Sequence, residues 1–320
     1  MLLAKMQIPA DVVPPPVSKL PVMYLNYFYH DTLYYSQDLG NSWKGKILPG
    51  DYRWGPMDAK GDGKYLALGT YSDNQQSYYS LNAGTTIHAD GQVANYGTGA
   101  KVSADGNVFA FVNGLSTSGL RVSTNQGASW ITRNTQYNTN DVCLSQDGRL
   151  MYVSDYVQGL YKSDDYGATL TKILANASLA AATSADGRCV YSKSHVNKNR
   201  IYISADAGAA FSYTALSRNV NSAILCTDTT GRYVLLAGGA DVFYSDDFGA
   251  SFTDIAYRLT AGIKMTAISN SYISPTGQHI AFASFSPGSY VVYVSTDYGA
   301  TFSAKPLPLT NGTPAGFAIN

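Results

Sequence analysis

The carboxylates of this chain are the first residues that could do chemistry, and they are all of one kind. The 22 acidic residues are aspartates, and the sequence contains no glutamate. Two aspartates could act as acid and base in an inverting glycosidase, whose carboxyl groups stand about 6.5–9.5 Å apart across a cleft. The aspartates in expected loops are Asp31, Asp51, Asp73, Asp90, Asp155 and Asp241. An Asp-dependent hydrolase is therefore an enzymatic possibility that the residues leave open.

The histidines and cysteines show neither catalytic nor metal-binding spacing. His30 precedes Asp31 directly, but adjacent residues at the end of a strand point to opposite sides, which argues against a catalytic pair. Cys143, Cys189 and Cys226 form no CxxC pair, so we expect buried free thiols rather than disulfides or a zinc site. Nucleophile-elbow, phosphate-loop and EF-hand motifs do not occur. We expect no metal and no cofactor.

Four of the nine arginines fall in expected loops, and one of them lies between two aromatic residues. The four could form an anion clamp, whereas solvated loop arginines are the alternative. Tyr52 and Trp54 flank Arg53, and such a cluster can stack on a sugar or an aromatic partner. Packing of Trp54 within the protein is the other possibility for that ring. The ligand-binding candidates are Tyr52, Arg53, Trp54, Tyr137, His195, Arg200, Arg218 and Arg258.

The elements that must position these residues come from a motif that occurs seven times, Ser-x-Asp/Asn-x-Gly-x-Ser/Thr followed by a large apolar residue. The copies begin at Ser36, Ser80, Ser123, Ser163, Ser204, Ser245 and Ser295, at intervals of 40 to 50 residues. The Asp or Asn caps its own backbone in an Asx turn, and the Gly supplies a positive φ. These structural residues are Asp38, Asn82, Asn125, Asp165, Asp206, Asp247 and Asp297, with Gly40, Gly84, Gly127, Gly167, Gly208, Gly249 and Gly299.

The asparagines indicate that the turn, rather than a charge, is what this position requires. Ala210 replaces the second Ser/Thr in the fifth copy, and we expect it to weaken that hairpin slightly.

A second repeat, a turn that ends in Gly, alternates with the first. It occurs at Asp62-Gly63 and again before Gly106, Gly148, Gly187, Gly231 and Gly277. Each unit then reads as strand A, Gly turn, strand B, loop, strand C, Ser-x-Asp motif and strand D, which is one propeller blade. We predict an all-β, seven-bladed β-propeller of four-stranded antiparallel blades. The expected blades are 17–48 with 313–320, 54–91, 98–135, 139–174, 179–215, 221–257 and 265–308.

The two ends of the chain fit a closed ring. There is no room for a strand A before the first motif, and Thr313 to Asn320 lies where that strand belongs. We therefore expect the C-terminal segment to complete the N-terminal blade, which removes the open sheet edges. Residues 1–16, with three consecutive prolines, are expected to form an extended arm before a single propeller domain over residues 17–320.

The seven motifs resemble the Asp-box, or bacterial neuraminidase repeat, family. This family includes sialidases, xyloglucan hydrolases, sortilin-type receptors, photosystem assembly factors, lectins and viral particle proteins. The sialidase pattern requires an Arg-Ile-Pro motif and a Tyr–Glu pair, whereas this chain has Gln7-Ile8-Pro9 and no Glu. The resemblance therefore implies a propeller without sialidase activity.

Charge and hydropathy exclude further classes of function. The 22 lysines and arginines balance the 22 aspartates, so no field draws in nucleic acid or an anionic membrane. No apolar stretch is long enough to span a membrane, and the first residues lack a secretory signal pattern. In a propeller the A–B and C–D turns share one face, and the variable D–A and B–C loops lie on the other.

We expect a non-catalytic binding or assembly module, with a virus or phage particle as one setting. Its protein partner in a larger assembly would dock through residues 1–16. A lectin that binds glycans on that loop face is the alternative, and an Asp-dependent glycoside hydrolase is the second alternative.

Overall fold

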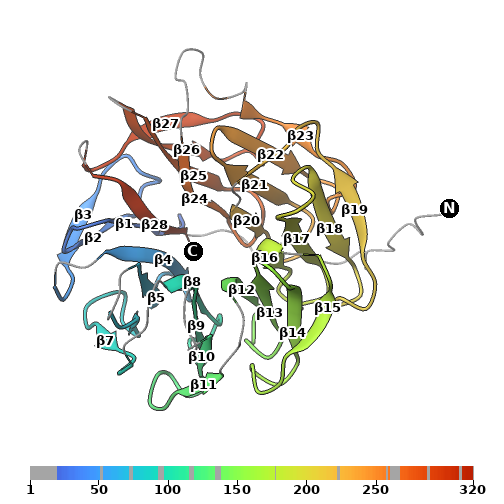
Figure 1. The fold of residues 1–320 in the computed structure, drawn as a ribbon. Helices are drawn as coiled ribbons and strands as arrows, with labels where there is room; N and C mark the ends of the chain where they lie inside the picture. Colours follow the sequence, from blue (N-terminus) through green and yellow to red (C-terminus); the bar gives the residue numbers. More distant parts are fainter. Residues whose placement is uncertain are drawn as a thin grey trace.

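A computed structural model describes most of the chain beyond the N-terminal segment. The described residues are 20–50, 53–71, 75–92, 97–114, 119–133, 138–176, 178–221, 224–256, 259, 267–286, 289–309 and 312–319. They form seven four-stranded antiparallel sheets arranged around a central axis (Figure 1). The predicted all-β, seven-bladed propeller is confirmed. The expected arm at residues 1–16 lies outside the described part.

Within each blade the strands are named A to D in order of their distance from the axis, so that strand A is the innermost and strand D the outermost. Blade 1 consists of β28 (Pro314–Ile319), β1 (Met23–Tyr27), β2 (Thr32–Ser36) and β3 (Lys44–Ile47). Blade 2 consists of β4 (Trp54–Lys60), β5 (Tyr65–Thr70), β6 (Tyr78–Ser80) and β7 (His88–Ala89). Blade 3 consists of β8 (Gly97–Val102), β9 (Phe109–Asn113), β10 (Leu120–Ser123) and β11 (Ile131–Arg133).

The other four blades follow the same order around the ring. Blade 4 consists of β12 (Thr139–Leu144), β13 (Met151–Asp155), β14 (Gly159–Ser163) and β15 (Thr171–Leu174). Blade 5 consists of β16 (Ser178–Thr183), β17 (Val190–Ser194), β18 (Arg200–Ser204) and β19 (Ser212–Ala215). Blade 6 consists of β20 (Ile224–Thr227), β21 (Val234–Gly238), β22 (Asp241–Ser245) and β23 (Thr253–Asp254). Blade 7 consists of β24 (Ala267–Ile273), β25 (Ile280–Ser286), β26 (Ser289–Ser295) and β27 (Ser303–Pro306).

The last strand of the chain closes the ring, as predicted. β28 pairs antiparallel with β1, with Ile319 opposite Met23 and Phe317 opposite Leu25. It occupies the innermost position of blade 1, next to β4 and β24 (Figure 1). Phe317 and Ile319 are buried there, so the segment contributes core packing as well as ladder hydrogen bonds.

Each Ser-x-Asp motif is a hairpin turn held by its own side chains. In the first copy Ser36 Oγ accepts the Gly40 N–H at 2.8 Å and donates to Asp38 Oδ1 at 2.7 Å. Asp38 Oδ1 also accepts the Ser42 N–H at 2.9 Å. Both Leu39 and Gly40 have positive φ, 56° and 82°. The turn therefore needs two consecutive left-handed residues, one more than the sequence analysis assigned.

The two kinds of turn are bonded to each other and from blade to blade. The Tyr166 N–H of the fourth motif donates to Arg149 O in the A–B turn of the same blade, so both turns share one face. Successive A–B turns are linked by backbone hydrogen bonds. In blades 3 to 7 the backbone N–H of one turn donates to the backbone carbonyl of the equivalent residue in the next turn. These residues are, in order, Ala104, Gln146, Ala185, Thr229 and Pro275.

Strand-B tyrosines add further bonds between neighbouring blades. The hydroxyl of Tyr24 donates to Gly63 O, that of Tyr152 to Gly187 O and that of Tyr191 to Gly231 O, at 2.9, 2.7 and 2.5 Å.

In the described part of the chain no helix is long and apolar enough to cross a membrane.

Deleting residues 314–320 should lower the melting temperature by roughly 10 °C or more. The deletion removes a buried strand and the burial of Phe317 and Ile319, each worth about 1.5–3 kcal/mol. Differential scanning calorimetry measures the effect. The control is Ile47→Ala on β3, where the side chain is 73% exposed and little change is expected. An unchanged melt of the truncated chain would contradict the closure role.

Acid should destabilise the protein through the box aspartates. Hydrogen bonds from the Ser42 side chain and backbone, with one from Ser36, lower the pKa of Asp38 to about 2. Because this folded-state pKa lies below the unfolded value, the stabilisation is complete above about pH 5 and is lost as the pH falls towards 2. We expect Asp38→Asn to fold normally at pH 7 and to show a weaker fall of the melting temperature between pH 5 and 2.

The Asn82 box shows how an amide can replace the carboxylate. Asn82 Oδ1 accepts the Thr86 N–H at 2.7 Å, and its Nδ2 donates to Thr86 Oγ1 at 3.1 Å. Asp31→Asn, in a B–C loop, is the matched control for the acid titration. An acid limb that is identical in wild type and Asp38→Asn would refute the role of this carboxylate.

Candidate binding site: the loop face and the central channel

The loop arginines named from the sequence do not converge on one clamp. Arg218 forms ion pairs with Asp241, at 2.5 Å, and with Asp254. The Arg200 guanidinium lies over the ring of Tyr213 in its own blade, 4.1 Å from the centroid. Arg200 begins β18 of blade 5 and Arg218 lies between β19 and β20, whereas Arg53 directly precedes β4 of blade 2 and forms a bridge with Phe28. Tyr52, Tyr137 and Arg258 fall outside the described residues.

Trp54 and His195 are both held by packing against other rings. Trp54 is fully buried and packs on Tyr78, with ring centroids 5.3 Å apart, so its ring belongs to the core and offers no stacking surface to a ligand. His195 stacks on Tyr156 of blade 4 at 3.8 Å between centroids. Burial, with smaller effects from Lys198 and Lys193, lowers the pKa of His195.

A hollow on the loop face gathers the arginine–aromatic cluster that the sequence suggested around Arg53. Its volume is about 510 Å³, and its lining includes Phe28, Tyr29, Arg53 and Tyr71. The Arg53 guanidinium lies 4.7 Å from the Tyr29 ring centroid, and its Nε donates to the Tyr29 hydroxyl. Tyr29 is 56% exposed and Tyr71 41%. The aromatic ring beneath Arg53 is thus Tyr29 of one B–C loop, and Tyr71 of a second B–C loop lines the same hollow.

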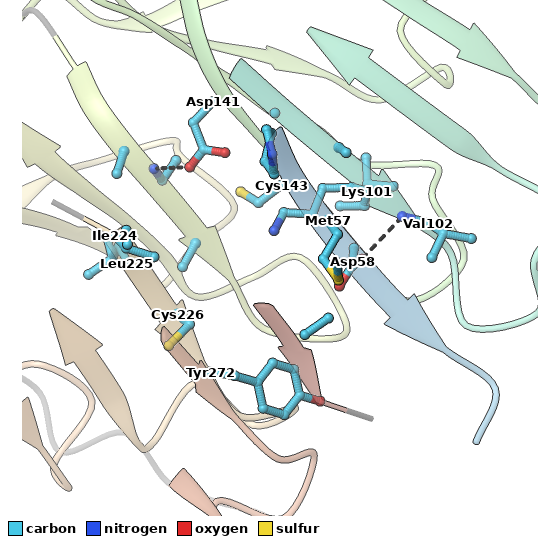
Figure 2. A pocket seen from close by; sticks show the side chains of 18 of the residues that line it. Met57, Asp58, Lys101, Val102, Asp141, Cys143, Ile224, Leu225, Cys226 and Tyr272 are labelled. Atoms are coloured by element: carbon cyan, nitrogen blue, oxygen red, sulfur yellow. Dashed lines mark hydrogen bonds between the residues drawn. The ribbon is translucent and has the colours of Figure 1, made fainter. Parts of the chain in front are cut away.

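The central channel is a second cavity, and the inner strands supply its charged residues. Its volume is about 570 Å³. The pairing of strands A and B places one residue of each blade in the same tier of the channel wall. These residues are Asp58, Lys101, Cys143, Ala182, Cys226, Tyr272 and Ala318. Figure 2 shows Asp58, Lys101, Cys143 and Cys226 around this space, with Asp141 nearby.

Lys101 is the unmatched cation of the channel. Burial opposes its charge, but the nearby carboxylates of Asp58 and Asp141 outweigh burial and raise the pKa of Lys101 above its usual value. The side chain is therefore an ammonium. No hydrogen bond or ion pair joins its Nζ to any residue in the described ranges.

The two carboxylates near Lys101 differ in how well they are compensated. Asp58 accepts the Val102 N–H at 3.1 Å and lies 3.7 Å from Lys60 Nζ. Asp141 accepts the backbone N–H groups of Val142 at 2.8 Å and Ala181 at 3.2 Å, and no lysine or arginine within the described segments pairs with it. Burial, only partly offset by Lys101 and these donors, raises the pKa of Asp141.

The thiols of the channel are neutral. Burial raises the pKa of Cys226 to about 12, and it also raises that of Cys143. Cys143 and Cys189 are buried and Cys226 is half-buried, and all three are free. Among the described residues, no group of three His, Cys or Asp side chains could hold a metal ion. The channel therefore offers fixed charges and apolar wall rather than an activated nucleophile.

The loop-face hollow borders the channel mouth, because Phe28 and Tyr71 line both cavities. The sequence analysis missed Asp58, Lys101 and Asp141. Their signal was a charged residue within strand A, five residues before the turn glycine for Asp58 and Lys101 and seven residues before it for Asp141. That pattern indicates a wall residue only once the strand is known to face the axis.

Four of the six aspartates considered for hydrolysis are described, and each has a structural bond. Asp90 is buried and pairs with Arg121 at 2.8 Å, and Asp241 pairs with Arg218. Asp155 is buried and accepts the N–H groups of residues 157 and 158, and Asp31 accepts the Thr32 hydroxyl. Asp51 and Asp73 lie outside the described residues.

Comparison with known proteins gives fold similarity alone. No family model matches the sequence, and no curated protein matches it. A functionally unknown protein from Desulfotomaculum acetoxidans aligns with a TM-score of 0.70 and 11% identity, over 94% of this chain and 98% of that one. YCF48 bound to a D1 peptide aligns at 0.59 and 13%, over 83% and 84%.

An enzyme is also among the structures with this fold. The GH74 xyloglucanase from Xanthomonas campestris aligns with a TM-score of 0.60 and 13% identity, over 79% of this chain and 46% of the enzyme. This chain therefore spans less than half of that protein. The similar structures thus include an enzyme and a peptide-bound protein, all built on the same propeller.

Trp54→Ala should destabilise the protein by about 3–5 kcal/mol, since it leaves a cavity in the core of blade 2. Urea denaturation measures the loss. The matched control is Tyr213→Ala, which truncates a 51% exposed ring and should cost less than about 1 kcal/mol. Equal effects of the two substitutions would contradict the core position of Trp54.

Proposed function

We propose that this chain is a non-catalytic binding module that holds a protein partner on its loop face. The observation that carries the proposal is the exposed cluster of Tyr29, Arg53 and Tyr71 in a hollow at the channel mouth. Tyrosine and arginine are the residue types that dominate binding energy in protein interfaces.

The state of the carboxylates supports a binding role over hydrolysis. A glycosidase needs two carboxyl groups free to exchange protons across a cleft. The described loop aspartates are instead engaged in ion pairs and turns, as with Asp90 and Asp155. A propeller of the same fold, YCF48, is bound to a peptide in its structure, which is consistent with a protein partner here.

A glycan is the second candidate ligand, favoured by the same exposed rings. Tyr29 and Tyr71 offer apolar ring surface, and Arg53 offers donors for sugar oxygens. A glycan array with the purified protein separates the two candidates. Binding that disappears in Arg53→Ala would favour the lectin, whereas silence across the array would favour the protein partner.

The double variant Arg53→Ala/Tyr29→Ala should release the protein from its native assembly. We expect tagged wild-type protein, isolated from its own source, to migrate as part of a larger complex of defined mass by native mass spectrometry. Loss of the cluster should shift most of it to the 34.3 kDa monomer.

The matched control is Arg188→Ala/Tyr166→Ala on the opposite face. Arg188 is exposed, and Tyr166 occupies a motif position where Ala83 and Ala207 occur naturally, so the control should fold and stay in the complex. A wild-type protein that travels alone, or equal retention of both double variants, would refute the proposal.

A further inference from the structure

The central channel is lined by a basic and an acidic side chain that have no ion-pair partner among the described residues. Lys101 of blade 3 and Asp141 of blade 4 influence each other electrostatically, but no ion pair within 4 Å joins them. Asp58, in contrast, has Lys60 and a backbone N–H beside it. The channel groups left without an ion-pair partner among the described residues are therefore the Lys101 ammonium and the Asp141 carboxyl group, both on the wall of the same cavity (Figure 2).

The opposite side of the channel is largely apolar. Blades 5 and 6 contribute Ala181, Ala182, Ile224 and Leu225 to the lining. Figure 2 shows Ile224 and Leu225 across the space from Lys101 and Asp58. Blades 5 and 6 thus offer apolar side chains across from Lys101, whereas their polar lining residues, which include Asp228, lie at or beyond the ends of the inner strands.

These features define the chemistry of a complementary ligand. Its carboxylate would meet Lys101, its ammonium would meet Asp141, and an apolar group would lie on the wall of blades 5 and 6. Each oxygen of Asp141 accepts one backbone hydrogen bond and retains a lone pair for another donor. The cavity volume of about 570 Å³ lies within the usual range of small-molecule sites.

We propose that the central channel binds a small zwitterion with an apolar substituent, of the class of an apolar α-amino acid. The site goes beyond the loop-face function, because it uses inner-strand residues and a different ligand. A peptide chain end would supply one of the two charges, so it satisfies half of the site.

Chemically matched probes test the two contacts separately. We expect leucine or phenylalanine to bind by isothermal titration calorimetry, and leucinamide and N-acetylleucine to bind at least tenfold more weakly. The amide lacks the carboxylate, and the acetyl derivative lacks the ammonium. Equal binding of all three compounds would overturn the zwitterion assignment, and so would no binding of any amino acid at 10 mM.

Two substitutions assign the contacts to residues. Lys101→Met should remove the preference for leucine over leucinamide, and Asp141→Asn should remove the preference over N-acetylleucine. Lys44→Met, at an exposed position on β3, and Asp31→Asn are the matched controls and should bind like the wild type. Unchanged affinities in Lys101→Met would overturn the proposal.

The native cysteines give a readout that needs no variant. Cys143 and Cys226 line the channel and Cys189 does not. Leucine should slow the alkylation of Cys143 and Cys226 by N-ethylmaleimide at least threefold, measured by peptide mass spectrometry, and should leave Cys189 unchanged. Equal rates with and without leucine would contradict channel binding. The loop-face experiment depends on none of these residues, so each proposal can fail without the other.

Discussion

The serine hydroxyl that opens each Asp-box is the contact on which the rest of the propeller depends. Ser36 Oγ joins the Gly40 N–H to the Asp38 carboxylate and so holds two successive residues in the left-handed region. For a non-glycine residue this conformation costs roughly 1–2 kcal/mol, which the bonds within the box must offset. The same pattern recurs in all seven copies, including the two with Asn.

Hydrogen bonds also connect the box turns to the turns that end the inner strands. In blades 2 to 7 the box turn bonds to the A–B turn of the same blade, and the A–B turns of blades 3 to 7 bond to one another around the channel. The inner strands end at those turns, so the register of the boxes fixes which residues face the axis. The pairing of strands A and B within each blade places Lys101 and Asp58 in the same tier.

The sequence predicts the architecture well because its determinants are local. The boxes and Gly turns are short motifs, and their order dictates blade number, strand order and closure by β28. The site depends instead on contacts between blades. Arg53 meets Tyr29 only because blades 1 and 2 are neighbours, and nothing in the local sequence shows that Trp54 faces the core while Arg53 faces solvent.

The channel illustrates the same limit more sharply. Lys101 and Asp141 lie forty residues apart, and each looks like an ordinary strand residue in its own segment. Their relationship appears only when two inner strands are placed side by side around the axis. The box face, by comparison, leaves few groups unmatched, because its carboxylates and turn amides bond to one another. Both candidate sites therefore lie where residues of several blades come together.

The direction of the A–B turn series has a mechanical consequence. Every bond in it runs the same way, from an N–H in one blade to a carbonyl in the next, and the last acceptor is Pro275 in blade 7. Proline has no N–H, so it cannot pass the series on to blade 1. Among the described residues the series therefore covers blades 3 to 7 and includes neither blade 1 nor blade 2. The junction of blades 7 and 1 is held instead by the pairing of β28 with β1 and by a shared core, in which Phe317 and Ile319 pack with Val292 of β26.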